Sequence, residues 1–502
     1  CLQSTDCGLC RMSGERCMDQ QRIIETIHDS LAISMKVAFS SNPRVAQSLR
    51  HSVRDGVAYS VMSGVGETYF AAYALFLGAT AAQVSLLAAI PPLFGAVTQL
   101  FAAWLEGRAG TRRALIVSSA LLHALSWFPI VWAPYLFPAH AVTAMVGCIV
   151  LYHAWIGFGA PLWCSLMADL VPARKRGRFF GGRTRLMSVA SFAALVVGGL
   201  VLEFFQARGS TRFGFAVIFT AAAAARMYSV YHLSRMVEPN TTDPVPRPAR
   251  SAPTCRYQTR FIRFSIFITA MNFAVAVAGP FFTVYMLRDL GFSYLQFTAA
   301  TAIAVVAQFL TLRTWGRLAD LFGNRAVLAT SGVIVPLVPA LWLLSPSFAW
   351  VLFIQALAGW SWAGSSLAAG NHLYDVVRPD RRAVYWATHN LMNNLGACGG
   401  ALIGGVMSEL FPSTFTLFGH VVHWTSGLWA LLLLSAILRA FALVTFLPTI
   451  EEVRPVPAFS ARAFVFRMIR SNQLAGFVLD RLGLGRRRRR PARASRPQTH
   501  TS

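Results

Sequence analysis

A polar run of residues occurs twice in this sequence, each time between two long apolar segments. The first copy extends from Asp169 to Arg176 and the second from Asp375 to Arg382, so the copies are 206 residues apart (375 − 169). Other residues recur 212 or 213 positions later: Phe70 and Phe282, Tyr73 and Tyr285, Gly110 and Gly323, Arg226 and Arg439, Glu238 and Glu451. An apolar chain made of two similar halves predicts a pair of related helical bundles.

The composition indicates that much of the protein surface lies in lipid. Hydrophobic residues make up 55% of the chain and charged residues 13%, whereas a soluble domain is about 25% charged. The formal net charge is +25. The basic residues lie in connections and tails rather than on one domain face, so we expect no nucleic-acid partner.

The apolar residues are grouped into segments long enough to cross a bilayer. A spanning helix needs about 20 apolar residues, and backbone groups in lipid must be hydrogen-bonded within the segment. The twelve candidate segments are 55–78, 82–105, 114–133, 140–166, 184–206, 213–233, 262–287, 293–313, 326–345, 349–374, 384–408 and 424–447. We predict an all-α polytopic membrane protein with twelve transmembrane helices in two pseudo-symmetric six-helix bundles. The predicted divisions are an N-terminal segment 1–52, a first bundle 53–233, a linker 234–261, a second bundle 262–448 and a basic amphipathic tail 449–502.

The connections between these segments alternate in charge. Basic connections surround Arg112, Arg176, Arg317 and Arg382, whereas residues 79–81, 134–139, 346–348 and 409–423 contain no Lys or Arg. The positive-inside rule then predicts that both termini and the linker face the cytoplasm, in a multi-pass protein of the cell inner membrane. The tail combines apolar residues with the run Arg486 to Arg490, which predicts contact with anionic lipid.

The cysteines do not predict a metal site. Cys7 and Cys10 form a C-x-x-C pair, but no His or second C-x-x-C lies at zinc-finger spacing. We therefore expect neither a metal nor another cofactor.

A motif after the eighth segment carries a family resemblance. It reads Gly316-Arg317-Leu-Ala-Asp320-Leu-Phe-Gly323-Asn-Arg325, and it resembles the G-x-L-A-D-x-x-G-x-[RK] loop of the major facilitator superfamily, of the bacterial type. The corresponding loop of the first half keeps Gly110 and the trailing arginines, but its acid, Glu106, stands four residues before the glycine. The resemblance covers about residues 53–448. It implies a secondary transporter whose two bundles surround one central site and expose it alternately to each side.

The resemblance also implies a cytoplasmic gate at these loops. The predicted gate residues are Gly316, Arg317, Asp320, Gly323 and Arg325, with Glu106 and Arg112 in the first half and the repeated pairs Asp169 with Arg176 and Asp375 with Arg382. Glycines permit a tight turn, an acid can face a helix N-terminus, and arginines can bridge to acids of the opposite half. The alternative is that these residues only set the topology and the turn.

Polar residues inside apolar segments are costly in lipid and therefore indicate the transport pathway. The candidates are Glu67, Tyr73, His153, Asn272, Gln308, His389, Asn390, Asn393 and Asn394. Glu67 is the acid nearest the middle of an apolar segment, where it could carry a proton, bind a cationic substrate or pair with a buried arginine. The last four residues form one helical stripe, for which hydrogen bonding between helices is as good an interpretation as substrate contact.

The sequence therefore predicts a transporter that moves a small organic solute by alternating access, coupled to protons through Glu67. A uniporter is also compatible. The rival classes are a membrane-embedded enzyme, for which no G-x-S-x-G, H-E-x-x-H or Walker A motif is found, and a receptor or scaffold on a transporter fold. The predicted partners are a small-molecule substrate, protons and membrane lipid. A monomer is compatible, and the oligomeric state stays open.

Overall fold

The structure is a computed structural model that describes residues 42–105, 111–171, 176–238, 255–377, 382–410, 414–417, 420–423 and 427–453. Glu106 lies outside these residues, as do most of the predicted N-terminal segment and linker and nearly all of the tail.

The first half consists of helices. They are α2 (Pro43–Val65), the 3-10 turn Glu67–Tyr69, α3 (Phe70–Phe76), α4 (Ala81–Leu105), α5 (Arg112–Leu125), α6 (Trp127–Leu136), the 3-10 turn Pro138–His140, α7 (Ala141–Leu170), α8 (Arg176–Gln206) and α9 (Thr211–Ser234).

The second half repeats this order and adds a small hairpin. Its elements are α10 (Cys255–Ala278), α11 (Phe281–Val284), the π-helix Tyr285–Asp289, α12 (Tyr294–Phe322), α13 (Asn324–Leu341), α14 (Phe348–Val376), α15 (Arg382–Leu410), β1 (Thr414–Leu417), β2 (His420–His423), α16 (Leu428–Phe446) and the 3-10 turn Leu447–Thr449.

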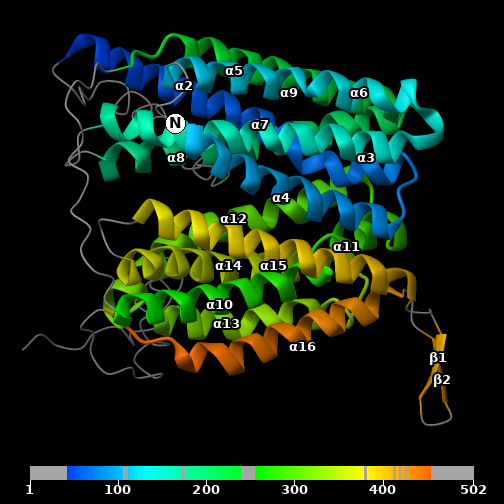
Figure 1. Cartoon of the computed structure of the whole chain (residues 1–502). Helices are drawn as coiled ribbons and strands as arrows, with labels where there is room; N and C mark the ends of the chain where they lie inside the picture. Colours follow the sequence, from blue (N-terminus) through cyan, green and yellow to red (C-terminus); the bar gives the residue numbers. More distant parts are fainter. Residues whose placement is uncertain are drawn as a thin grey trace, which may run out of the picture.

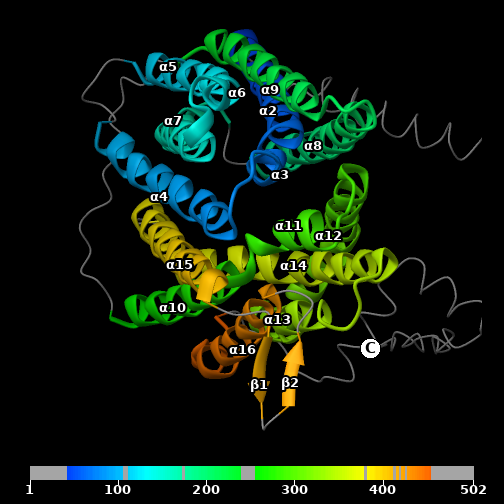
Figure 2. The same ribbon diagram turned by 90° about the vertical axis from the view of Figure 1, so that its right-hand side faces the viewer.

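The helices form two bundles that lie side by side, α2 to α9 above and α10 to α16 below in Figures 1 and 2. Taking α2 with α3, α5 with α6 and α10 with α11 as interrupted rods, the described residues form twelve rods, six in each bundle. The predicted all-α membrane fold of two bundles is thereby confirmed. The hairpin is an addition to that prediction: β1 pairs antiparallel with β2 in a connection that sequence reasoning treated as a bare loop.

Within the residues that the structure describes, ten helical segments are long and apolar enough to cross a membrane. The two remaining rods contain α2 and α15, and both carry more polar residues. α2 begins with an arginine-containing turn, and α15 carries the stripe from His389 to Asn394. Several polar residues of these two helices face partners inside the protein rather than lipid.

The first helix begins earlier than the sequence reasoning placed its span. Asn42 caps α2 by accepting a hydrogen bond from the backbone N–H of Arg44 at 3.0 Å, and Pro43 occupies the first helical position. An Asn cap followed by Pro is a strong helix start. Asp55 consequently lies in the interior of α2 rather than at its end.

The two bundles meet through α4 with α15 and through α8 with α12. α7 ends beside Asp169, and α14 ends beside Asp375. We call this end of the molecule the arginine-rich end and the opposite end the arginine-poor end. One hydrophobic core containing Tyr69, Tyr285 and Trp342 runs through both halves toward the arginine-poor end. Near the arginine-rich end each half has a separate core.

Hydrogen bonds between the halves lie on the arginine-poor side. Ser85 Oγ donates to the backbone oxygen of Ala401 at 2.8 Å, and the hydroxyls of Tyr69 and Thr298 are 3.0 Å apart. The backbone N–H of Leu295 donates to Glu203 at 3.1 Å. These hydrogen bonds join the halves toward the arginine-poor end.

Candidate functional site

The first rod of the chain is interrupted at Gly66, directly before Glu67. α2 ends at Val65, and a 3-10 turn leads into α3. A side chain at position 66 would bring its Cβ within 2.3 Å of Trp127, so only glycine allows this close approach. Breaks of this kind within membrane helices are typical of transport sites.

The carboxyl group of Glu67 has two short hydrogen bonds. Ser63 Oγ donates to one oxygen and Tyr152 Oη donates to the other, each at 2.5 Å. The Tyr152 ring is fully buried in α7, and its centroid is 4.0 Å from that of His123. Glu67 therefore lies inside the first bundle and not in lipid.

A second buried acid, Asp55, lies deeper in the same bundle. Its carboxylate is 3.4 Å from Arg183 of α8 and 3.9 Å from Arg226 of α9, and it accepts a hydrogen bond from Ser229 Oγ at 2.6 Å. All three charged side chains are almost fully buried. A buried acid without partners would be very costly, and this arrangement supplies two cations and a hydroxyl.

The two acids are connected through aromatic and basic side chains. Arg226 Nε donates to His123 Nδ1 at 2.8 Å. The His123 ring packs against Tyr152 at an interplanar angle of 44°, and Tyr152 donates a hydrogen bond to Glu67. We call the set Asp55, Arg183, Arg226, Ser229, His123, Tyr152 and Glu67 the buried polar chain. It involves five helical rods of the first half and lies along the interior of the bundle.

Sequence reasoning named Glu67 as a site residue and Arg226 only as a residue that recurs in the second half, and it missed Asp55. The predicted first span started at residue 55, so the acid was taken as the end of a helix. The Asn42–Pro43 start signal was present and would have extended the helix. Arg183 was likewise read as part of a basic loop, although it lies in α8 and points into the bundle.

A cavity of about 240 Å³ lies beside the buried polar chain. Its wall includes Asp55, Arg183 and Arg226, together with the aromatic residues Tyr59, Trp155 and Trp163. The Arg183 guanidinium lies 4.5 Å from the Trp163 ring centroid, a distance typical of a cation–π contact.

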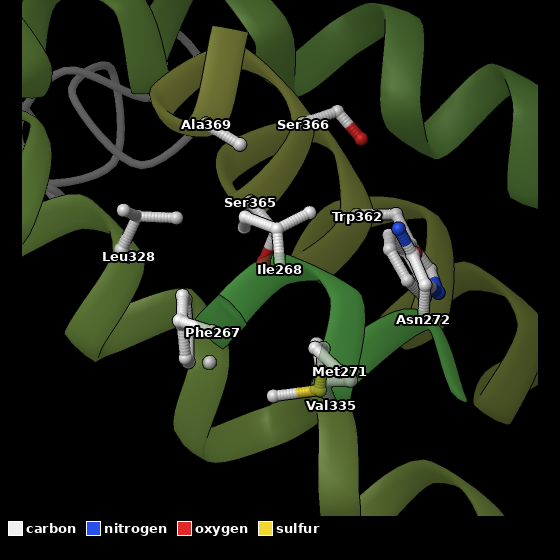
Figure 3. Close-up of a pocket in the computed structure, with 11 residues that line it drawn as sticks. Phe267, Ile268, Met271, Asn272, Leu328, Val335, Trp362, Ser365, Ser366 and Ala369 are labelled. Atoms are coloured by element: carbon white, nitrogen blue, oxygen red, sulfur yellow. The ribbon is translucent and has the colours of Figure 1, made fainter. Parts of the chain in front are cut away.

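The second half has a cavity at the equivalent place, with different chemistry (Figure 3). It measures about 150 Å³ and is lined mainly by apolar side chains of α10, α13 and α14, with Asn272 and two serines as its polar groups. Phe267 and Met271 stand where the repeat places Asp55 and Tyr59 (267 − 55 = 212 and 271 − 59 = 212).

The second buried arginine, Arg439, is the counterpart of Arg226. It donates to Ser435 Oγ at 3.0 Å and to the backbone oxygen of Val335 at 3.1 Å. Among the described residues, its bonds go to hydroxyl and carbonyl groups and none of them is an ion pair. Both halves therefore have a buried arginine at this place, but Asp55 of the first half is replaced by Phe267 in the second half.

The polar stripe of α15 packs against α10. His389 Nδ1 is 3.0 Å from Ser265 Oγ, and Asn393 accepts from Thr269 Oγ1 at 3.1 Å. Asn394 donates to the backbone oxygen of Asn390 at 2.8 Å. Hydrogen bonding between helices therefore accounts for His389 and Asn393, while a role in the pathway stays a prediction.

Other predicted pathway residues lie in varied surroundings. Tyr73 is buried among Phe215 and Phe219 in the aromatic core. His153 Nδ1 is 3.0 Å from the backbone oxygen of Ile149, and Gln308 is half-buried on α12. None of these three is in the buried polar chain, and their role in transport stays a prediction.

The predicted gate residues of the first half form an ion-pair cluster at the arginine-rich end. Arg112 is 2.7 Å from Asp169 and 3.2 Å from Glu238. It also donates to Ser165 Oγ at 2.9 Å. These contacts hold α5, α7 and the end of α9 together within one bundle.

The corresponding residues of the second half also contact their own bundle. Asn324 donates to Asp375 at 2.8 Å, and the backbone N–H of Arg325 donates to Glu452 at 2.8 Å. Gly323 adopts a φ of +87°, as the predicted tight turn requires.

The remaining gate residues complete the set. Gly316 faces Leu367 of α14, and Arg317 and Asp320 are exposed at the end of α12. Glu106 and the side chains of Arg176 and Arg382 lie outside what the structure describes.

The described residues contain no group of three or more His, Cys, Asp or Glu side chains positioned to hold a metal ion. The charged groups of the site are instead paired with one another. The fold and the buried charges together define a two-bundle membrane transporter.

Comparison with known proteins identifies the family. The sequence profile of the Major Facilitator Superfamily matches residues 56–271 and 262–485, so the chain belongs to this superfamily. No curated protein matches the sequence.

Several solved transporters share the fold. A mutant of the nucleoside transporter NupG has a TM-score of 0.62 at 12% identity, covering 81% of this chain and 100% of that chain. A bacterial homolog of the human lysosomal transporter Spinster, in an inward-facing occupied conformation, has a TM-score of 0.60 at 16% identity, covering 84% and 100%. A bacterial homologue of the iron transporter ferroportin has a TM-score of 0.59 at 12% identity, covering 81% and 99%. At these identities the likeness concerns the fold alone.

Proposed function

We propose that this protein is a proton-coupled secondary transporter that moves a small organic solute by alternating access. The observation that carries the proposal is the carboxyl group of Glu67, which lies at a helix break inside the first bundle and is bonded by Ser63 and Tyr152. An acid inside a helical bundle is a candidate proton carrier, and the two hydrogen-bond partners of this carboxyl group are neutral hydroxyls.

The asymmetry of the packing supports an alternating mechanism. A common core and inter-bundle hydrogen bonds join the halves toward the arginine-poor end, whereas each half has its own core at the arginine-rich end. The arrangement fits a state in which the site opens toward the arginine-rich end. By the positive-inside rule that end faces the cytoplasm.

The cytoplasmic loops would act as a gate in the opposite state. In the present arrangement Arg112, Asp169 and Glu238 bond within the first half. Rocking of the bundles would bring the exposed Arg317 and Asp320 toward the other half, where they could form new contacts. Cysteine cross-linking between position 317 of α12 and the facing helix α8 should then increase when a substrate is bound from outside.

A flux experiment tests the proton step. The purified full chain is reconstituted into liposomes that enclose a pH-sensitive dye, after a thermal-shift screen of metabolites has identified a solute that stabilises the protein. Adding this solute to wild-type vesicles should move protons together with it. Glu67→Gln should abolish the proton signal, whereas Glu409→Gln, an exposed acid at the end of α15, should leave it intact. Proton movement that persists in Glu67→Gln would reject Glu67 as the carrier.

The same vesicles separate the rival classes. A transporter delivers the solute unchanged, a membrane-embedded enzyme converts it, and a scaffold leaves it outside. Analysis of the vesicle contents by mass spectrometry distinguishes the three outcomes.

A further inference from the structure

We propose that the cavity of the first half binds a small organic carboxylate whose acid group pairs with Arg183 and Arg226. The inference rests on the proposed transport function and names the substrate class. Three observations support it: the net charge of the cavity wall, the hydrogen-bond donors that the wall presents, and the volume of the cavity.

The cavity wall has more positive than negative charge. Asp55 supplies one negative charge, and Arg183 and Arg226 supply two positive charges at 3.4 and 3.9 Å from it. Both guanidinium groups line the cavity. Because a buried excess charge is costly in a membrane, the site favours a ligand that brings a compensating negative charge.

The wall also presents unused hydrogen-bond donors. The described contacts of Arg183 use Nε and Nη2, and those of Arg226 use Nε and Nη1. One terminal nitrogen of each guanidinium is therefore left for a ligand within the described part of the chain. Trp163 Nε1 is buried, and it has no acceptor among these residues. A ligand with two acceptor oxygens, such as a carboxylate, would complement these donors.

The size and the aromatic wall favour a compact organic body on that carboxylate. An apolar cavity of about 150 Å³ holds benzene, and the present cavity of about 240 Å³ has room for a ring with an acid group. Tyr59, Trp155 and Trp163 supply aromatic surface beside the guanidinium groups. Packing against such faces is favourable for a planar or apolar ligand.

Proton uptake and anion binding are linked by charge. With Glu67 ionised, the two acids balance the two arginines of the buried polar chain. Tyr152 donates to Glu67 at 2.5 Å, and the Arg226 guanidinium lies 5.3 Å from the Tyr59 ring centroid, so these groups share one environment. Protonation of Glu67 leaves one positive charge uncompensated, and a monoanion restores neutrality. We therefore expect one proton to accompany each carboxylate.

Cys164 provides a reporter for the cavity. It lines the cavity, and its side chain is exposed at the surface of the described protein. In a full-length variant whose other cysteines are replaced by serine, the rate of maleimide labelling measures access to the site. The probes are acetate, pyruvate and benzoate, with benzyl alcohol and benzylamine as the neutral and cationic controls.

At least one of the carboxylates should slow labelling about tenfold at a concentration near ten times its dissociation constant, and benzylamine should not. Arg183→Gln should abolish this protection, whereas Arg208→Gln, an exposed arginine beyond the end of α8, should retain it. If Arg183→Gln fails to fold, the labelling rates of the wild-type protein with the carboxylates, benzyl alcohol and benzylamine still test the proposal. Protection by benzylamine alone, or by no carboxylate, would overturn the proposal.

Glu67→Gln separates this proposal from the proposed function. The variant should still bind the carboxylate, but its protection should no longer strengthen as the pH falls. Carboxylate binding without any coupled flux in vesicles would refute proton-coupled transport and leave the binding site intact. Coupled flux of another solute, without protection of Cys164 by carboxylates, would refute only the carboxylate site.

Discussion

In the first half Asp55 lies buried between Arg183 and Arg226, and in the second half the residue at the same place in the repeat is Phe267. The arginine recurs as Arg439, bonded to Ser435 and backbone oxygens. The first cavity is therefore charged, whereas the second is lined mainly by apolar side chains.

The difference shows that a duplicated fold can keep its helix packing while the charge of its two interiors differs. A charge in the membrane interior is costly unless it is paired or hydrogen-bonded. The first half satisfies this condition with reciprocal ion pairs. The second half instead has a cavity wall made mainly of apolar side chains.

The largest predicted effect concerns the buried acid. Asp55→Leu leaves two guanidinium groups without their carboxylate and should lower the free energy of unfolding by about 3–5 kcal/mol. The matched change in the second half, Phe267→Leu, should cost only about 1 kcal/mol because both residues are apolar. Denaturant titration of the purified proteins in detergent measures both values. Equal losses would show that the two interiors do not differ in this way.

Replacing the two equivalent arginines, Arg226 and Arg439, should lower the free energy of unfolding by different amounts. Arg226→Met removes a partner of Asp55 and His123, although Arg183 remains, and should cost about 2–3 kcal/mol. Arg439→Met removes a buried charge that has no acid partner among the described residues, and should lie within about 1 kcal/mol of the wild type. The same titration tests both variants, and a larger loss for Arg439→Met would contradict the assignment.

Substitutions at close contacts between helices, in contrast, should change the stability by similar amounts in both halves. A Cβ at Gly157 of α7 would lie 2.1 Å from the backbone oxygen of Gly95, and one at Gly359 of α14 would lie 2.1 Å from that of Ala304. Replacing either glycine by alanine should force the helices apart and cost about 1–3 kcal/mol.

Each of these glycines has a control in its own helix. A Cβ added at Gly147 of α7 or at Gly370 of α14 would meet no atom within 4 Å in the described part of the chain. Alanine there should be neutral or gain up to about 1 kcal/mol from helix propensity. Thermal unfolding of the four variants measures the contrast, and an equal loss in the controls would mean that close contact between helices does not set the result.

The smallest predicted effect lies at the arginine-rich end. Arg112→Gln removes the ion pairs with Asp169 and Glu238, which are partly exposed, and should cost about 1 kcal/mol at low salt and less at high salt. Arg325→Gln keeps its backbone bond to Glu452 and should stay within about 0.5 kcal/mol of the wild type. Unfolding at two ionic strengths tests the difference, which should shrink as salt is added.

The sequence alone was sufficient to predict the architecture. Long apolar segments can only be helices in lipid, and the recurrence of Asp169 in Asp375 and of Arg226 in Arg439 revealed two halves. The loop from Gly316 to Arg325 indicated the family, which the sequence profile confirms. Glu67 was recognisable as a candidate because an acid inside an apolar segment needs an explanation.

The site itself depended on the tertiary structure. Asp55, Arg183 and Arg226 belong to three helices that are far apart in the sequence, and their contacts follow from the rotation and depth of α2, α8 and α9. Hydrophobic periodicity identifies the face of a helix but not the partner that the face meets. A buried charge is stable only where its counter-charge reaches it, and only the packed bundle brings these side chains within a few ångströms of one another.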